Sequence, residues 1–279
     1  MTIAVVVQAR VGSTRLPGKV LRPLAGAPLL ERVVERVRAV AALRPFEPPF
    51  ELIVATTVDA ADDAAERLCR ALDVRCFRGH PTDLLYRHLA AARALGADVV
   101  VKVPSDCPLI DPAAVARVLA AWDAAGGRLD YLSNLHPPSW PDGNDVEVMS
   151  LAALEQAFRE ARAPHEREHT TPFLWDSPGR FRVGNVVLGG GRDLSMSHRF
   201  TVDWPEDLSF AAAVYEALLP ALGPAFGLEA ILDLLARHPE IHALNARFLG
   251  VNWYRHHLDV LRTVGAADTR PAPAQEPSP

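Results

Sequence analysis

Gln8–Lys19 reads Gln-Ala-Arg-Val-Gly-Ser-Thr-Arg-Leu-Pro-Gly-Lys and lies between an apolar run at residues 3–7 and a helical pattern that begins near Pro28. These flanking patterns predict that a buried first strand opens into a long loop. The loop contains three cations, two glycines and the hydroxyls of Ser13 and Thr14. Backbone N–H groups, hydroxyls and positive charge are the groups with which proteins bind phosphates. The sequence therefore predicts a phosphate-binding loop after the first strand.

The spacing within this loop differs from two common phosphate-binding motifs. A Walker A loop has Gly, four residues, Gly-Lys and then Ser or Thr. Here five residues separate Gly12 from Gly18, and Val20 follows Lys19. The dinucleotide fingerprint Gly-x-Gly-x-x-Gly is also absent from this turn. The stretch is thus either a phosphate loop of another type or a basic surface loop whose glycines only form the turn.

Composition limits the classes of protein to which the chain can belong. Its 279 residues are enough to bury a full core, and 49% hydrophobic with 23% charged residues is typical of a soluble globular protein. A formal net charge of −5 argues against general binding to nucleic acid. Cys69, Cys76 and Cys107 show no CxxC spacing, so neither a disulfide framework nor a zinc site is indicated. The first apolar run is too short for a signal or a membrane span, so we expect a cytoplasmic protein without a membrane partner.

Strand and helix patterns alternate along the first 125 residues. Apolar runs typical of buried strands occupy residues 3–7, 51–57, 74–77 and 97–103. Helical patterns occupy residues 29–40, 59–73, 82–95 and 112–125, and Glu47–Pro49 is expected to break the first of them. This alternation predicts an α/β fold with a mostly parallel sheet flanked by helices.

In the second half of the chain, strand and helix patterns do not alternate in the same regular way. An α+β insertion is expected at about residues 130–200, with strands at 129–133, 146–149 and 181–188 and helices at 150–162 and 168–176. Further helices are expected from Glu206 and from Leu228. We expect one domain over residues 1–265, followed by a disordered, Pro-rich tail at residues 266–279.

Two aspartates follow predicted strands almost one hundred residues apart. Asp106 comes directly after the fourth strand, and Asp203 ends a later strand. In open α/β sheets, ligands lie at the carboxyl ends of strands. Carboxylates there suit Mg²⁺, which takes one or two protein carboxylates together with substrate phosphate oxygens. Asp111, just before Pro112, is instead expected to cap the next helix.

The loop and the two aspartate segments together resemble the cytidylyltransferases that make CMP-linked acidic sugars, in particular their spore-coat polysaccharide biosynthesis branch. The aspartate segments are similar to the family patterns Gly-Asp-x-Pro-Leu-Ile and Asp-x-Pro-Glu-Asp, with Ser105 in place of the glycine. The resemblance covers about residues 1–245 and implies a Rossmann-like (GT-A-type) sheet. It also implies that CTP activates an acidic sugar of the nonulosonic-acid type, with release of pyrophosphate, for surface polysaccharide or glycan biosynthesis.

The same resemblance implies roles for individual residues. The catalytic residues would be Arg15, Lys19, Asp106 and Asp203, and Mg²⁺ would bind Asp106 and Asp203. The nucleotide would be held by Gln8, Ala9, Arg10, Gly12, Ser13, Arg15, Lys19 and Arg78. The acidic sugar would be bound by Asn134, Asp145, Glu147, His169 and Arg199. A hydrogen-bonded cluster that braces the insertion is an open alternative for this last set. Asp83 and Arg87 would either approach the nucleotide or form an i,i+4 helix pair.

Two other functions remain open from the sequence. A glycosyltransferase would consume a ready-made nucleotide sugar, although the Asp-x-Asp motif of such enzymes is not found after a strand. A catalytically idle nucleotide-binding protein is the second, but the chain contains both aspartates and all three loop cations. A homodimer is expected, with contacts from the insertion or from the apolar C-terminal residues Trp253, Tyr254 and Leu258.

Overall fold

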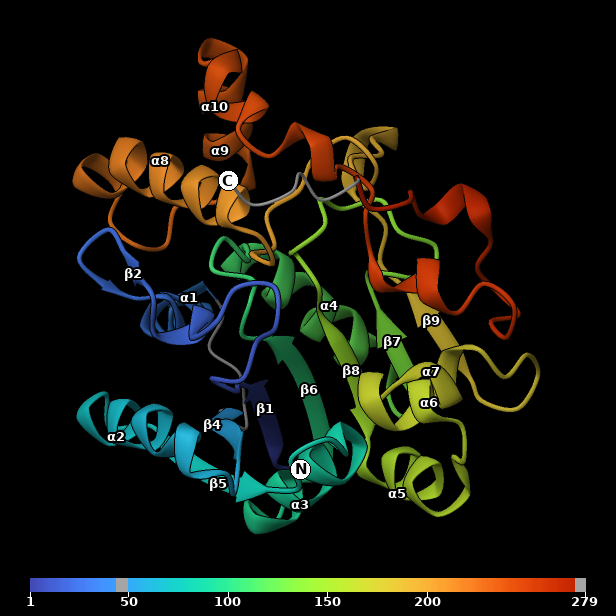
Figure 1. The fold of residues 1–279 in the computed structure, drawn as a ribbon. Helices are drawn as coiled ribbons and strands as arrows, with labels where there is room; N and C mark the ends of the chain where they lie inside the picture. Colours follow the sequence, from blue (N-terminus) through green and yellow to red (C-terminus); the bar gives the residue numbers. More distant parts are fainter. Residues whose placement is uncertain (44–49, 274–279) are drawn as a thin grey trace.

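The structure is a computed structural model that describes residues 1–43 and 50–273 (Figure 1). Within these residues the main sheet contains β1 (Ile3–Gln8), β4 (Phe50–Thr57), β5 (Arg75–Gly79), β6 (Val99–Pro104), β7 (Tyr131–Ser133), β8 (Glu147–Ser150) and β9 (Val183–Asn185). Their spatial order is β5-β4-β1-β6-β8-β7-β9. β1 pairs in parallel with β4 and β6, whereas β8 is antiparallel to both of its neighbours. The predicted mostly parallel α/β sheet is confirmed.

Helices cover both faces of this sheet. Ile3, Val5 and Val7 of β1 enter a core that also contains residues of α1 (Leu29–Leu43), α2 (Asp63–Ala71) and α4 (Pro112–Ala125). Ala4 and Val6 enter the opposite core, with α3 (Leu84–Ala94) and α5 (Leu151–Glu160). Because β1 is covered on both faces, its sequence is a continuous apolar run and not an alternating one. The central strands are therefore rigid supports for whatever their carboxyl ends hold.

Two predicted helix starts are confirmed by their side-chain caps. The Asp111 carboxylate accepts a hydrogen bond from the backbone N of Ala113 at 2.8 Å at the start of α4. The Ser150 hydroxyl accepts one from the backbone N of Ala153 at 3.1 Å at the start of α5. Each side chain satisfies a backbone donor that the first turn of a helix leaves without a partner. Asp111 is therefore a structural residue, as expected.

Residues 130–200 add β7, β8 and β9 to the edge of the same sheet. The helix predicted at residues 168–176 is wrong in its extent: the structure has two short helices, α6 (Pro164–His169) and α7 (Pro172–Trp175). Thr170 between them has a φ of 75°, outside the helical region, and Pro172 cannot donate a helical hydrogen bond. The interruption places His169 at the end of α6, beside the sheet edge.

The chain ends in α8 (Pro205–Leu222), α9 (Leu228–Arg237), α10 (Pro239–Ala243) and irregular structure that runs beside α6 and α7 (Figure 1). The predicted disordered tail is wrong for residues 266–273, where Thr269 is buried and the backbone N of Arg270 donates to the Gly250 oxygen at 2.8 Å. These contacts satisfy backbone groups that disorder would leave to water. Residues 274–279 and the predicted break at Glu47–Pro49 lie outside the described residues. Within the described ranges, no helix has the length and apolarity to cross a membrane.

Candidate active site

The loop Gln8–Lys19, called the opening loop below, leaves the carboxyl end of β1 and folds back on itself. The backbone N groups of Ser13 and Gly18 both donate to the Val11 oxygen, at 2.8 and 3.1 Å. The backbone N of Val11 donates to the Asp62 carboxylate at 2.6 Å. Gly18 has a φ of 70°, in the left-handed region that glycine adopts without a steric penalty. This bend starts a 3-10 turn at Lys19 and directs its side chain toward the end of β6.

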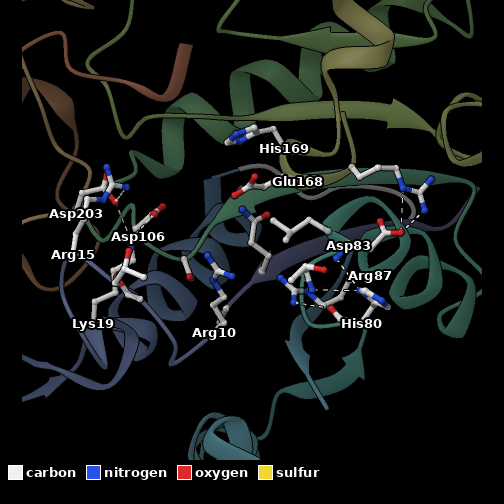
Figure 2. A pocket seen from close by; sticks show the side chains of 18 of the residues that line it. Arg10, Arg15, Lys19, His80, Asp83, Arg87, Asp106, Glu168, His169 and Asp203 are labelled. Carbon is white, nitrogen blue, oxygen red and sulfur yellow. Dashed lines mark hydrogen bonds and ion pairs between the residues drawn. The ribbon is translucent and has the colours of Figure 1, made fainter. Parts of the chain in front are cut away.

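Lys19 is the centre at which the two predicted aspartates meet. Its Nζ donates to Asp106 Oδ2 at 2.8 Å, to Asp203 Oδ1 at 3.0 Å and to the Val202 backbone oxygen at 3.0 Å (Figure 2). Burial by itself lowers the pKa of Lys19, but the charges of Asp106 and Asp203 outweigh burial and raise this pKa. Two strand ends that are far apart in sequence thus supply carboxylates to a single cation.

Asp203 connects this pair to two arginines. Its Oδ1 lies 2.9 Å from Arg15 Nη2, and its Oδ2 lies 3.1 Å from Arg199 Nη2. Burial raises the pKa of Asp203, but Lys19, Arg15 and Arg199 lower it well below its usual range. Asp203 is therefore ionised at neutral pH. The structure brings Arg15, Lys19, Asp106 and Asp203, the predicted catalytic residues, into one cluster.

A cavity of about 630 Å³, the loop cavity, opens beside this cluster (Figure 2). Six of the eight predicted nucleotide residues line it, namely Gln8, Ala9, Arg10, Ser13, Arg15 and Lys19. The Oε1 atom of Gln8 is buried without a hydrogen-bond partner in the described part of the chain, which a ligand donor would satisfy. Arg10 lies in the middle of the cavity in Figure 2 and has no carboxylate partner among the described residues.

Two predicted nucleotide residues are not among those that line the loop cavity. Gly12 lies in the opening loop, and a Cβ at its position would meet no atom within 4 Å. Arg78, on β5, donates to the carboxylates of Asp63 and Glu66 at 2.6 and 2.8 Å. It also donates to two backbone oxygens, so its guanidinium is engaged on the α2 side of the sheet. The structure does not bring Arg78 to the site, because local carboxylates take up its donors.

The far wall of the loop cavity contains residues that sequence reasoning left uncertain or missed. His80 and Asp83 line it from the β5–α3 connection, Arg87 lines it from α3, and Arg167 and Glu168 line it from α6. Asp83 pairs with Arg167, with Nε at 3.1 Å, and not with Arg87. The i,i+4 pair is therefore not formed. The polar segments around Asp83 and Arg167 were visible in the sequence, but their pairing across 84 residues was not.

A second cavity of about 660 Å³, the strap cavity, continues from the first. Both are lined by Gln8, Arg10, Thr14, Arg15, Asp106, Glu168, His169 and Asp203. The strap cavity extends from the two aspartates toward β8 and the C-terminal residues 250–257. The Lys19 cluster thus lies at the junction of two adjoining spaces, each large enough for a small ligand.

Three of the five predicted sugar-binding residues are engaged by protein groups. Glu147, on β8, is buried and accepts from Lys102 and from the Tyr131 hydroxyl. Asn134 is fully buried, donates to the Asn144 oxygen at 2.6 Å and accepts from the backbone N of Val146 at 2.9 Å. For Asn134 and Glu147 the bracing alternative fits the structure.

Arg199 has the same character. Its guanidinium is buried and pairs with Asp142 at 2.7 Å, with Asp203 at 3.1 Å and with Asp207 at 3.0 Å. Burial lowers the pKa of Arg199, but Asp142 and Asp207 raise it above its ordinary value. All these interactions hold the connection to α8 in place. No donor is left to face an acceptor carboxylate in the way that the sequence suggested.

Asp145 and His169 are available to a ligand. Asp145 lines the strap cavity and accepts one hydrogen bond among the described residues, from the backbone N of Gly143 at 3.1 Å. Burial, followed by repulsion from Asp142, raises the pKa of Asp145 to about 8. His169 lines both cavities and stacks on Trp253 with 3.8 Å between ring centroids. Burial lowers the pKa of His169 to about 3, so the ring is neutral.

Comparisons with known proteins indicate the family of the chain. Residues 4–226 match the family model described as Cytidylyltransferase. The spore coat polysaccharide biosynthesis protein SpsF of Bacillus subtilis is 30% identical over 239 residues, which are 85% of this chain and 95% of that protein. A 3-deoxy-manno-octulosonate cytidylyltransferase of an Acidovorax species is 33% identical over 190 residues, 64% of this chain and 68% of that protein.

A solved cytidylyltransferase from Leptospira borgpetersenii superposes with a TM-score of 0.78 at 29% identity. The match covers 86% of this chain and 95% of that chain. The family match includes the opening loop, Asp106 and Asp203, which are the parts that meet at Lys19. The chain therefore belongs to the cytidylyltransferase family.

Proposed function

We propose that this protein transfers CMP from CTP to a hydroxyl of an acidic sugar, of the nonulosonic-acid type, and releases pyrophosphate. One observation carries the proposal: Asp106 and Asp203 share the Lys19 ammonium, within 3.0 Å, where the loop cavity and the strap cavity meet. The loop cavity, with Arg10, Arg15 and Lys19, suits a triphosphate. The strap cavity, with Asp145 and aromatic walls, suits a polyhydroxylated acceptor.

The relatives support this reaction class and a role in surface polysaccharide or glycan biosynthesis. The SpsF relative is named for spore coat polysaccharide biosynthesis. Several relatives are named 3-deoxy-manno-octulosonate cytidylyltransferases, and that substrate is a sugar acid with a free hydroxyl. A nine-carbon sugar acid is a larger member of the same chemical class, and the strap cavity, at about 660 Å³, is large enough for it.

The two aspartates fit Mg²⁺ as the cofactor. They offer hard oxygen donors that already converge on one positive charge. In the described ranges no group of three or more His, Cys, Asp or Glu residues is arranged to hold a metal. Asp106 and Asp203 would therefore bind the ion together with phosphate oxygens, as Mg²⁺ commonly does. When bound, Mg²⁺ would neutralise phosphate charge at the reacting centre.

The chain's own residues would position the reactants and move a proton. Arg10, Arg15 and Lys19 bind the phosphates, and Lys19 exchanges a carboxylate contact for a phosphate oxygen. The acceptor oxygen forms a bond to the α-phosphorus, and the bond from that phosphorus to the oxygen between the α- and β-phosphates breaks, so that pyrophosphate leaves with this oxygen. Asp145 accepts the proton of the attacking hydroxyl. A base with a pKa near the working pH is suited to this step.

A screen of pyrophosphate release tests the proposal. CTP, UTP, GTP and ATP are each supplied with Mg²⁺ and with a sugar acid, a phosphorylated aminosugar or no acceptor. We expect release only with CTP and the sugar acid, and Lys19→Ala should raise KM for CTP and lower kcat. Release with the phosphorylated aminosugar alone would overturn the acceptor class. CTP binding without release from any pair would indicate a catalytically idle protein, and glycosyl transfer from a nucleotide sugar would indicate a glycosyltransferase.

A homodimer remains a prediction. Trp253 and Tyr254, two of the residues named as possible contacts, line the chain's own strap cavity. Leu258 and Val260 are exposed and are available to a second copy. The molar mass measured by light scattering would distinguish a monomer from a dimer.

A further inference from the structure

Residues 250–270, called the strap, form a closed loop beyond the segment that matches the family model. The two ends of the strap are tied together. The backbone N of Arg270 donates to the Gly250 oxygen at 2.8 Å, and Asn252 Nδ2 donates to the Asp268 oxygen at 2.8 Å. Because both ends are fixed at one place, the residues between them are held as a unit and not as a free tail.

The middle of the strap is anchored on α7. The Asp176 carboxylate accepts hydrogen bonds from the backbone N groups of Arg262 and Thr263, at 2.9 and 2.7 Å. Tyr254 is buried, with its ring 6.1 Å from that of Trp175. These contacts hold the strap at the end of α7, and its residues 250–257 line the strap cavity.

Three of the five lysines and arginines that line the strap cavity are neutralised by protein carboxylates. Lys102 is paired with Glu147, and Arg199 is paired with three aspartates. Arg15 lies 2.9 Å from Asp203. A saturated cation offers little to an incoming anion, because a new contact must replace an existing one.

Arg255, in the short 3-10 turn Trp253–His256 near the start of the strap, is different. Its Nη1 donates to the Asn252 backbone oxygen, and no carboxylate pairs with it in residues 1–43 and 50–273. Burial, followed by the positive charge of Arg15, lowers its pKa. A half-buried guanidinium beside another cation is stabilised by an anionic ligand, and its fork of donors matches a carboxylate. Arg10 also lacks a carboxylate partner, but it lines the loop cavity as well, where the triphosphate would engage it.

Trp253 adds a flat apolar surface next to this cation. Its indole ring stacks on His169, with an angle of 16° between the ring planes, and both residues line the strap cavity. His169 is the last residue of α6, so the stacked pair connects the strap to α6 across the strap cavity. An anion-binding group beside an aromatic wall is the arrangement that an acidic sugar requires: one polar anchor and one surface for the ring.

We propose that the strap is the element that selects the acceptor, with Arg255 binding its carboxylate and Trp253 on His169 packing against its ring. The proposal rests on the proposed function, because it assigns the recognition of that acceptor to particular residues. Arg255 takes the role that the sequence suggested for Arg199.

The test compares sugar acids with their uncharged methyl esters in the full-length protein. The probes are 3-deoxy-manno-octulosonate and N-acetylneuraminate, each with its ester, supplied with CTP and Mg²⁺. We expect the wild type to favour the acid over the ester at least tenfold in kcat/KM. Arg255→Gln should lower kcat/KM for the acid by about 10–100-fold, mainly through KM, and should change the ester by less than about threefold. Arg255→Lys should restore part of the preference.

Arg10→Gln is the matched control: it should raise KM for CTP and leave the acid-to-ester ratio unchanged. Calorimetric binding of acid and ester in the presence of α,β-methylene-CTP repeats the comparison when turnover is too slow to measure. If the wild type prefers the acid and Arg255→Gln keeps that preference, the proposal for Arg255 is wrong while the proposed function stands. If the wild type shows no preference in turnover or in binding, the acidic acceptor fails and the proposal for Arg255 fails with it.

Discussion

The loop cavity and the strap cavity share a boundary but use their charged residues in opposite ways. In the loop cavity, Arg15 and Lys19 pair with the very carboxylates that suit Mg²⁺, so a bound metal and phosphates would exchange those pairs for new ones. In the strap cavity, Lys102 and Arg199 are locked in buried pairs that brace the sheet and α8. The difference teaches that a cluster of charges is a binding site only where its partners can be exchanged.

The largest effect is expected on kcat, from a change to Asp203 at the boundary that the two cavities share. Asp203→Asn removes one of the two carboxylates on Lys19, and we expect kcat to fall by about 10³-fold, or about 4 kcal/mol in activation free energy. The fold should persist, because Arg199 keeps Asp142 and Asp207 as partners. Pyrophosphate release measures the first effect and circular dichroism the second. Asp233→Asn, an exposed change on α9, is the matched control, and equal activity of the two variants would remove Asp203 from the mechanism.

The next largest effect should be on stability. Arg199→Met leaves the buried Asp207 without its guanidinium, and we expect the free energy of unfolding to fall by about 3–5 kcal/mol in a urea titration. Arg192→Met breaks an exposed pair with Glu229, and its urea midpoint should stay close to that of the wild type because solvent screens such a pair. An Arg199 variant of normal stability with a raised KM for the sugar acid would instead make Arg199 a ligand-binding residue, and the contrast between the cavities would fail.

The pH dependence of stability tests the role of Asp145 in the strap cavity. Its pKa in the folded protein, about 8, lies above the unfolded value near 3.9, so the fold disfavours its ionised form. This group therefore stabilises the protein at low pH, and the contribution is lost as pH rises toward 8. The side chain introduced by Asp145→Asn does not ionise. The free energy of unfolding of this variant, relative to wild type, should therefore rise by on the order of 1–3 kcal/mol between pH 5 and 8.

Melting temperatures of the two proteins across this pH range measure the effect. Asp130→Asn is the control: Arg182 lowers the pKa of Asp130, so its carboxylate stays ionised and the difference from wild type should be flat between pH 5 and 8. A flat difference for Asp145→Asn as well would mean that Asp145 is an ordinary ionised carboxylate and a poor candidate for the base.

The smallest effect should come from Arg78. Its donors are satisfied by Asp63 and Glu66 on the α2 side, so Arg78→Gln should change kcat and KM for CTP by less than about twofold. The loss of these partly exposed pairs should leave the melting temperature close to that of the wild type, because solvent screens them. Steady-state kinetics with CTP measure this effect. A tenfold higher KM for CTP would indicate that Arg78 binds the nucleotide, as the sequence suggested.

Most of the fold was predictable because its signals are local. Buried strands and amphipathic helices leave patterns within ten to fifteen residues, and the caps at Asp111 and Ser150 follow from their immediate neighbours. The prediction of one helix at residues 168–176 was wrong because Thr170, at positive φ, and Pro172 interrupt it. The tail failed because its Pro-rich composition predicts disorder, whereas Arg270 and Thr269 pack on Gly250, twenty residues earlier.

The candidate site also has features that the sequence predicted and features that it did not. By itself the sequence determined which cations, hydroxyls and carboxylates follow the strands, because a parallel sheet places every strand's carboxyl end at one edge. Only the tertiary structure decided that Asp106 and Asp203 meet at Lys19 and that Arg78 and Arg199 are engaged elsewhere. It also left Arg255 without a carboxylate partner among the described residues. The physical reason is that a charged side chain is available or saturated according to partners that are distant in sequence, and composition carries no record of that pairing.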